Sequence, residues 1–443
     1  MRGKNLKLVK WNEKTEKIFN KLIWCLTVVL YVSIGLFDNH TLASLLFYGI
    51  TGCIGCLILL KELMSFRPKI QSYHVIVMIF IMFCYASSLW GWDTGYPVST
   101  AGYILRMFIC SSVLYYYFEK QESVEPLLQA LKWGGYILAY SCLIGYGLQN
   151  VFDILLNGGR LYNDFVCHIG SEQIHGLFYG IFVPNINFLG LYVAIPMVVG
   201  FFDIAYLRKN TFLEVCYILP VMLFIIISGG KMNFIILAIS TFIIILLKTK
   251  GDNIKVTIIR WGIVVIVTVM ALYVLSFFPM FKETFSRFYA MVANLLGKSY
   301  EVSTNERVTM FEVGIEQVLK TPLGGIGIDN ARFLLEKETG IHTYLHCNYI
   351  ELLTGVGIVG TALFYMCYCY PLLFLFKYRK VADEHTIICV LLMLVSFVAE
   401  IAIVTYTLRT TYLLFALYFI HARRLKENII QVRKNINDDE SKR

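Results

Sequence analysis

The first thing this 443-residue sequence lacks is charge. Asp, Glu, Lys and Arg make up only 16% of the chain, whereas hydrophobic residues make up 58% and the mean hydropathy is +0.65. A soluble protein of this length could not bury so much apolar surface, so the composition excludes the soluble classes. Apolar runs of roughly 16 to 25 residues recur, and roughly 20 helical residues cross a bilayer. The sequence therefore predicts an all-α, polytopic membrane protein.

Other absences narrow the class further. No CxxC pair is followed by a second pair at zinc-site spacing, and the twelve cysteines lie mostly in apolar runs, so we expect them to pack between helices. We predict no metal and no cofactor. The basic N-terminal segment lacks a small-residue cleavage site, so we expect the first apolar run to be retained. The net charge of +9 does not indicate nucleic acid, because Lys and Arg gather in the tail and in alternate short loops.

The apolar runs predict about twelve transmembrane helices in a single integral membrane domain, 1–443. One class of connecting loops is rich in Lys and Arg, and the short members of the other class are almost free of them. Because basic loops stay in the cytoplasm, both termini are predicted to be cytoplasmic, including a basic tail at 422–443. We place the spans near 18–37, 41–63, 73–92, 98–118, 127–149, 181–207, 212–228, 231–247, 258–278, 346–376, 386–404 and 407–421.

Two loops on the predicted outer side are long, at 150–180 and 279–345, and loops of that length usually carry function. In the second, Ser303-Thr-Asn-Glu306 is a capping-box pattern before apolar residues at helical spacing. PLGGIG (322–327) would end that helix, and Asp329 would cap a second short helix that ends before Gly340. We therefore predict short amphipathic helices in a large outer loop.

Charged groups at a membrane surface are candidates for a site, since burying an unpaired charge is costly. Lys231 follows two glycines at an outer turn, where it either extends to the interface or points into an outward-facing cavity. Arg307 lies in the first turn of the loop helix, where a cation opposes the helix dipole, although a solvated face would also explain it. Arg160 and Arg409 lie in outer loops, where a structural role is the simpler interpretation.

HTYLHCNYIELLTGVGIVG (342–360) places two histidines four residues apart before an apolar run. His342 and His346 could chelate a metal, but Glu351, the nearest further ligand, would point away on a continuous helix. His346 could equally be a plain interfacial aromatic residue or a general base that works near neutral pH. Asn348 and Tyr349 would then orient the ring or bind a polar ligand.

The segments TNERVTMFEVGIEQVLKTPLGGIGIDNARF and HTYLHCNYIELLTGVGIVG resemble the core signature of the O-antigen ligase and polysaccharide-polymerase family. That signature is an Arg that starts a loop helix, then P-x-x-G-x-G, a second short helix, and H-N-x-Y-L-E before G-x-x-G. GLFYGIFVPNINFLG, which contains Asn185, and ISGGKMNF resemble two further family segments. The chain departs from the family where Lys231 replaces the usual Arg and where Cys347 separates His346 from Asn348.

The resemblance implies a metal-independent, inverting glycosyltransferase at the outer face of the bacterial cytoplasmic membrane. Its donor would be a glycan on undecaprenyl diphosphate. By position, Lys231 and Arg307 would hold the diphosphate, and His346 would activate the acceptor hydroxyl. The implied partners are this donor, a glycan acceptor, the lipid bilayer, a flippase and a chain-length regulator. The candidate substrate-binding residues are Arg160, Asn185, Asn348, Tyr349, Arg409 and His342.

Three functions are weighed. The leading one is a polymerase of capsular, O-antigen or exopolysaccharide repeat units, and the alternative is an O-antigen ligase that uses the same donor with a lipid A core acceptor. The third is a transporter or lipid flippase, because twelve spans with both ends inside is also a transporter layout. Such proteins tend to show repeat symmetry and charged or broken helices at the midplane. Here the halves differ in loop length and the candidate charges lie at the outer mouth, which favours an enzyme.

Overall fold

The computed structural model describes most of the chain as helices. The described residues are 12–37, 41–62, 69–157, 166–169, 172–178, 181–182, 186–207, 211–228, 231–248, 302–379 and 383–440, with isolated residues between 256 and 293. The helices are α1 (Glu13–Phe37), α2 (Thr41–Glu62), α3 (Ser72–Ala86), α4 (Gly95–Phe118), α5 (Glu125–Tyr146), α6 (Leu148–Asn157), α8 (Ile186–Phe202), α9 (Thr211–Ser228), α10 (Lys231–Lys248), α13 (Val302–Lys320), α14 (Ala331–Thr339), α15 (Asn348–Lys377), α16 (Glu384–Ala399) and α17 (Arg409–Glu440).

The membrane-spanning part confirms the all-α class. Among the described residues, eight helices are long and apolar enough to cross a membrane, and α10 and α16 hold shorter apolar stretches. The predicted span at 258–278 lies almost entirely outside the described residues, so the total of twelve stays a prediction. The eight helices are α1, α2, α3, α4, α5, α8, α9 and α15.

The predicted loop at 150–180 holds more structure than the sequence indicated. It contains α6 and most of a three-stranded antiparallel sheet in the order β1 (Val166–Ile169), β2 (Glu172–Phe178) and β3 (Ile181–Phe182). The predicted span at 181–207 was therefore wrong at its start, because α8 begins only at Ile186. Strands of this length are too short for a period of two to stand out in the sequence.

The last helix also exceeds its prediction. The span at 407–421 and the tail after it form one continuous helix, α17, which reaches Glu440. No Gly or Pro occurs between Arg409 and Glu440 to end it.

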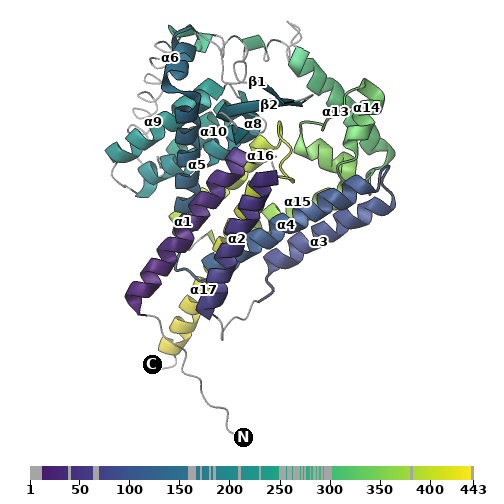
Figure 1. Ribbon diagram of the computed structural model, residues 1–443. Helices are drawn as coiled ribbons and strands as arrows, with labels where there is room; N and C mark the ends of the chain where they lie inside the picture. The colour runs from purple at the N-terminus through teal and green to yellow at the C-terminus, as the bar shows by residue number, and fades with distance from the viewer. Residues whose placement is uncertain are drawn as a thin grey trace.

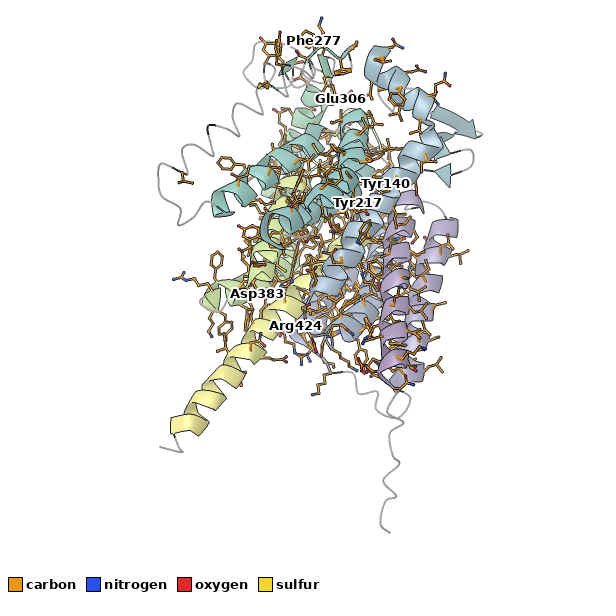
Figure 2. The ribbon with its side chains drawn as sticks, turned by 90° about the vertical axis from the view of Figure 1, so that its left-hand side faces the viewer. Tyr140, Tyr217, Phe277, Glu306, Asp383 and Arg424 are labelled. Atoms are coloured by element: carbon orange, nitrogen blue, oxygen red, sulfur yellow. The ribbon has the colours of Figure 1, made fainter. Side chains whose placement is uncertain are left out.

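Different helices and strands lie at the two ends of the molecule. The start of α1 and the last turns of α17 lie at the bottom of Figure 1, and α6, β1, β2, α13 and α14 lie at the top. In Figure 2, Glu306, the neighbour of Arg307 on α13, lies near the upper end, and Asp383 and Arg424 lie toward the lower end. Both long loops are therefore at one end, which we call the loop end.

One interior region is held by ion pairs that the sequence analysis did not single out. The ammonium group of Lys132 on α5, only 1% exposed, lies 2.7 Å from Asp203 Oδ2 and 2.8 Å from Glu214 Oε1. Asp203 begins a short π-helix after α8, and Glu214 lies in the first turn of α9. A buried lysine without these carboxylates would be strongly destabilising. The cluster therefore ties α5 to the connection between α8 and α9.

The glycine-rich loop at 322–327 completes the backbone pairing of α15. α15 is broken at Gly357, whose φ is 62° and ψ is −170°. Around the break, the backbone N–H of Ile358 donates to the Pro322 carbonyl (2.8 Å), and the N–H of Ile326 donates to the Thr354 carbonyl (3.0 Å). A Cβ on Gly325 would lie 2.5 Å from the Gly355 carbonyl. The glycines of both segments are needed because two backbones touch here.

The turn between α3 and α4 covers the other side of this loop. Trp92 N–H donates to the Ile326 carbonyl (3.0 Å), and Trp90 Nε1 donates to the Gly324 carbonyl (2.9 Å). Ser87 Oγ accepts from the N–H of Ile328 (3.1 Å). The loop is thus clamped between α15 and the α3–α4 turn, and the segments that flank it are held in place with it.

Gly357→Ala should lower the free energy of unfolding by about 3 kcal/mol, because that region of φ and ψ is almost exclusive to glycine. The new Cβ would also lie 2.3 Å from the Leu323 carbonyl group. Thermal unfolding of the detergent-solubilised protein measures the effect. The matched control is Gly52→Ala on the exposed side of α2, where nothing lies within 4 Å. Equal melting temperatures of the two variants would contradict this account.

Candidate functional site

The site is built around His346, in the short segment between α14 and α15. Its φ is 55°, a left-handed conformation that residues other than glycine adopt only rarely and at some cost in free energy. The ring is half-buried and lies 4.2 Å, between ring centroids, from the ring of Tyr344. Strain of this kind persists only where the surroundings enforce it, so the contacts of the segment decide how His346 is presented.

Glu351 holds the residue before His346. Its carboxylate, 1% exposed, accepts the backbone N–H of Leu345 through Oε2 at 2.8 Å. The helix is not continuous through the histidines, because α15 begins only at Asn348, so the condition under which Glu351 would point away is not met. Glu351 therefore lies in the first turn, where a Glu side chain can reach back to the preceding backbone.

Asn348 holds the residues after His346. Its backbone N–H donates to the Glu400 carbonyl (2.8 Å), and its Oδ1 accepts from the N–H groups of Thr405 (2.9 Å) and Tyr406 (3.1 Å). Asn348 is fully buried. Of the two roles weighed for it, the structure favours orienting the histidine segment over contacting a ligand.

Tyr349 is also engaged inside the protein. Its hydroxyl donates to the Phe397 carbonyl (2.9 Å), and its ring stacks on Tyr365 with centroids 5.4 Å apart. Tyr365 and Tyr368 in turn donate to the buried carboxylate of Glu400, at 2.6 and 2.9 Å. Tyr349 thus joins α15 to α16 and fixes the direction in which α15 leaves the site.

Arg307 on α13 supplies the positive charge at His346. Burial, and then the nearby Arg307 guanidinium, lower the pKa of His346 from its ordinary value of 6.5 to about 4. Among the described residues, no hydrogen bond or ion pair to Arg307 is found. The pair therefore offers a neutral imidazole, able to accept a proton at neutral pH, beside a cation able to receive an anion.

The two histidines do not act together. His342 Nδ1 lies 2.8 Å from Glu336 Oε2, and its exposed ring packs at the edge of Phe333 at a centroid distance of 5.7 Å. In the described part of the chain, no three His, Cys, Asp or Glu side chains are grouped to hold a metal ion. The geometry therefore gives no support to the chelating pair.

The remaining candidate site residues lie either inside the protein or outside the described residues. Arg409 lies inside the protein, 1% exposed, where it donates to Ser44 Oγ (3.0 Å) and lies 4.9 Å from the Phe47 ring centroid on α2. These contacts agree with the structural role that was the simpler interpretation of the sequence. Lys231 is the first residue of α10, but its side chain lies outside the described residues. Arg160 and Asn185 lie outside them altogether.

Two helix starts in the outer loop differ from the sequence expectations. α13 begins at Val302, so Ser303 lies within the helix and is not its cap. The residue before α14 is Asn330, and Asp329 instead accepts from Arg332 Nε (2.7 Å) and from Thr100 Oγ1 (3.1 Å). Gly340 ends α14 in a left-handed conformation, as predicted.

Sequence reasoning missed Arg332 and took Asp329 only as a helix cap, not as its ion-pair partner. Asp329 also has a left-handed backbone, with a φ of 62°. The ion pair between its carboxylate and Arg332 anchors the start of α14 beside the clamped loop. The available signal was weak, since Asp-Asn before a helix is typical of an ordinary cap.

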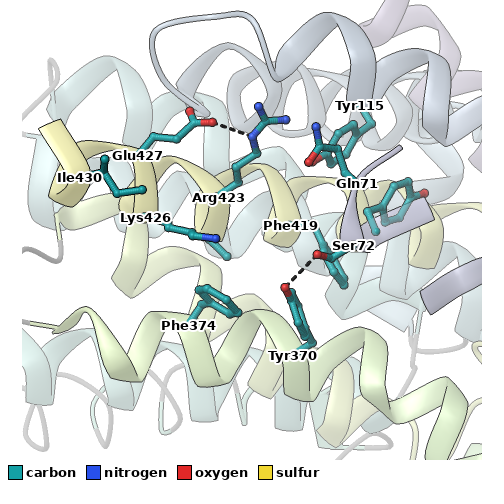
Figure 3. A pocket seen from close by; sticks show the side chains of 12 residues that line it. Gln71, Ser72, Tyr115, Tyr370, Phe374, Phe419, Arg423, Lys426, Glu427 and Ile430 are labelled. Carbon is teal, nitrogen blue, oxygen red and sulfur yellow. Dashed lines mark hydrogen bonds and ion pairs between the residues drawn. The ribbon is translucent and has the colours of Figure 1, made fainter. Parts of the chain in front are cut away.

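A cavity of about 310 Å³ lies elsewhere, between α3, α4, α15 and α17. Figure 3 shows Tyr370 and Phe374 of α15 facing Arg423 and Lys426 of α17 across it. Those α15 residues lie roughly 35 Å along the helix from His346, at 1.5 Å per residue. This cavity is therefore separate from the site.

The fold and the site together define a membrane-embedded helical protein that presents a neutral histidine and an arginine at its loop end. Residues 215–365 match the family model described as O-antigen ligase. The match includes Lys231, Arg307, His346, the loop at 322–327 and the broken part of α15 that it contacts. It confirms the family resemblance seen in the sequence. It supports glycosyl transfer in glycan processing. A comparison with curated proteins finds no match.

Glu351→Ala should lower the free energy of unfolding by about 1–3 kcal/mol, because the buried N–H of Leu345 loses its acceptor. Glu351→Gln keeps an oxygen in the same place and removes a buried charge, so it should stay within about 1 kcal/mol of the wild type. Thermal unfolding in detergent compares the two. If Gln is as damaging as Ala, the charge and not the hydrogen bond is what the site requires.

Proposed function

We propose that this protein is a polymerase that joins oligosaccharide repeat units carried on undecaprenyl diphosphate into a surface polysaccharide. The reaction would take place at the outer face of the bacterial cytoplasmic membrane, with both termini in the cytoplasm. The observation that carries the proposal is the neutral His346, constrained at the loop end beside Arg307, for which the described part of the chain offers no ion-pair partner. The family match over residues 215–365 supports it.

In the proposed reaction, an acceptor hydroxyl attacks the anomeric carbon of the donor sugar from the side opposite the diphosphate. A glycosidic C–O bond forms as the bond from that carbon to the diphosphate oxygen breaks, and the configuration inverts. The hydroxyl proton passes to His346. The leaving diphosphate keeps the bonding electron pair, and Arg307 and Lys231 would hold its charge. The role of Lys231 rests on the family resemblance.

The position of Arg307 has a second effect. A base with a pKa near 4 is neutral at pH 7, but it is a weak acceptor. A bound diphosphate would offset the charge of Arg307 and so raise the pKa of the imidazole. Substrate binding would thereby strengthen the base only when the leaving group is in place.

The O-antigen ligase is the second candidate, favoured by the description of the matching family. It would use the same donor and the same two residues, with lipid A core as acceptor. Deleting the gene and separating the surface glycans on a gel distinguishes the two. Loss of the ladder with single repeats retained indicates a polymerase, and loss of capped lipid while polymer is still made indicates a ligase.

A flippase and a chain-length regulator are the protein partners that a polymerase would require.

His346→Asn and Arg307→Ala should each reduce glycosyl transfer by about 100-fold or more, the usual contribution of a general base or a fixed charge. Asn tolerates the left-handed backbone at position 346, so His346→Asn should unfold at the wild-type temperature or above it. Transfer is measured with purified protein and lipid-linked donor. Lys320→Ala, at the exposed far end of α13, is the matched control and should keep its activity. Wild-type product from both site variants would refute the mechanism.

The acid limbs of kcat/KM and kcat should differ, because the first reports the pKa of His346 in the free enzyme and the second its pKa in the bound enzyme. Activity needs the neutral imidazole, so kcat/KM should be constant above the pKa of free His346 and fall as the pH drops through about 4. The acid limb of kcat should lie at higher pH, because the bound diphosphate raises the pKa in the complex. Recovery of activity on return to pH 7 controls for acid unfolding. An acid limb of kcat/KM near the ordinary histidine value would contradict the assignment.

A further inference from the structure

Four aromatic side chains gather on the surface at the loop end. Trp92 is 50% exposed and Tyr96 is 36% exposed, and both come from the α3–α4 turn and the start of α4. The Tyr96 ring lies 5.1 Å from Phe333 of α14 and 6.4 Å from His342, between centroids. We call Trp92, Tyr96, Phe333 and His342 the aromatic patch. Phe333 is half-buried and the other three rings are exposed. An exposed apolar patch bordered by polar groups is a candidate interaction site.

The patch is held rigidly. Besides the bond from Trp92 N–H to Ile326, the Asp93 carbonyl accepts from Asn330 Nδ2 at 3.0 Å. The Asp93 carboxylate accepts the N–H groups of Gly95 (2.7 Å) and Tyr96 (3.0 Å). Exposed side chains on so constrained a backbone lose little entropy when they bind a ligand.

The patch lies next to the proposed reaction site. Ala331 and Leu335 of α14 are buried against Met310 of α13 and Leu345, the neighbour of His346. On the same helix, Phe333 belongs to the patch and Lys337 borders it, with Lys337 Nζ 5.7 Å from the Trp92 ring centroid. The helix α14, about 10 Å across, therefore separates the patch from the helix that carries Arg307.

We propose that the aromatic patch binds a saccharide chain of the substrate, an inference that rests on the proposed function. The apolar faces of sugar rings stack on exposed aromatic rings. The hydroxyl groups at the sugar edges need hydrogen-bonding partners, and the exposed Glu336 and Lys337 stand among these rings. This mixture of rings and charges suits a polyhydroxylated ligand.

The neighbouring Trp90 provides a contrast within the same turn. Its ring packs against Phe83 at 5.8 Å between centroids, and the nearby Leu89 and Leu323 are 86% and 68% exposed. That apolar setting is typical of a tryptophan at a membrane interface. Trp90 and Trp92 are separated only by Gly91, so the turn presents one ring in an apolar setting and the other among charged groups.

Tryptophan fluorescence tests the binding without turnover. The full chain is placed in lipid nanodiscs, and the signal of each ring is the difference between the wild type and its Trp→Phe variant. The probe is the oligosaccharide released by mild acid from the lipid-linked glycan of cells that carry the gene. We expect it to change the emission of Trp92 and not that of Trp90, and lipids with brominated chains to quench Trp90 more strongly. A Trp92 signal that responds to the brominated lipids and not to the saccharide would overturn the proposal.

Kinetics give the second test. Trp92→Ala with Tyr96→Ala should raise KM about tenfold and leave kcat within about twofold, because the lost contacts are made equally in the ground and transition states. Whether KM rises for the donor or the acceptor tells which chain the patch holds. Leu89→Ala, on the same turn, is the control with unchanged KM. A fall in kcat at constant KM would overturn the proposal.

The proposed mechanism at His346 and the saccharide site at the aromatic patch can be refuted independently. If His346→Asn keeps full activity, the proposed mechanism is wrong, yet saccharide binding at Trp92 is still decided by fluorescence. If Trp92 does not respond while His346→Asn is inactive, only the saccharide site is wrong.

Discussion

A helix in a membrane cannot leave its backbone groups unpaired, and α15 is broken at Gly357. The loop at 322–327 satisfies the groups around that break, and this backbone contact is the constraint on which the loop end depends. It needs glycine in both segments of the contact, since a Cβ on Gly325 or Gly357 would lie within 2.5 Å of a carbonyl group of the other segment. The α3–α4 turn, α14 and the segment that carries His346 are each attached to the loop or to the start of α15.

The electrostatics of the site follow from this framework. Two buried carboxylates near the site have partners of their own: Glu351 holds the Leu345 N–H, and Asp329 pairs with Arg332. Burial, and then the Arg307 guanidinium, lower the pKa of His346. A cation beside a neutral imidazole suits an anionic ligand, which in the proposed function is the leaving diphosphate.

The sequence predicted single residues better than the relations between them. His346 and Arg307 were candidates from their positions, and the family resemblance gave them their roles; the structure places them close enough for Arg307 to lower the pKa of His346. Asn348 and Tyr349 were placed near the right histidine, but their partners lie at 397–406, which no local pattern reveals. Arg409 was expected at the last outer turn, but its burial against α2 depends on a contact with a segment more than 360 positions away in the chain.

By itself, the sequence determined the membrane class, the ends of most spans and the helices of the outer loop, because apolar run length, turn glycines and charge are local quantities. Only the tertiary structure decided why the glycines of 322–327 and 355–357 are needed, which way Glu351 points, and that Trp92 lies beside α14. Each of these depends on which distant backbones meet, and packing of the whole bundle sets that. The strained backbone of His346 belongs to the same group, since its neighbours and not its own preference hold it there.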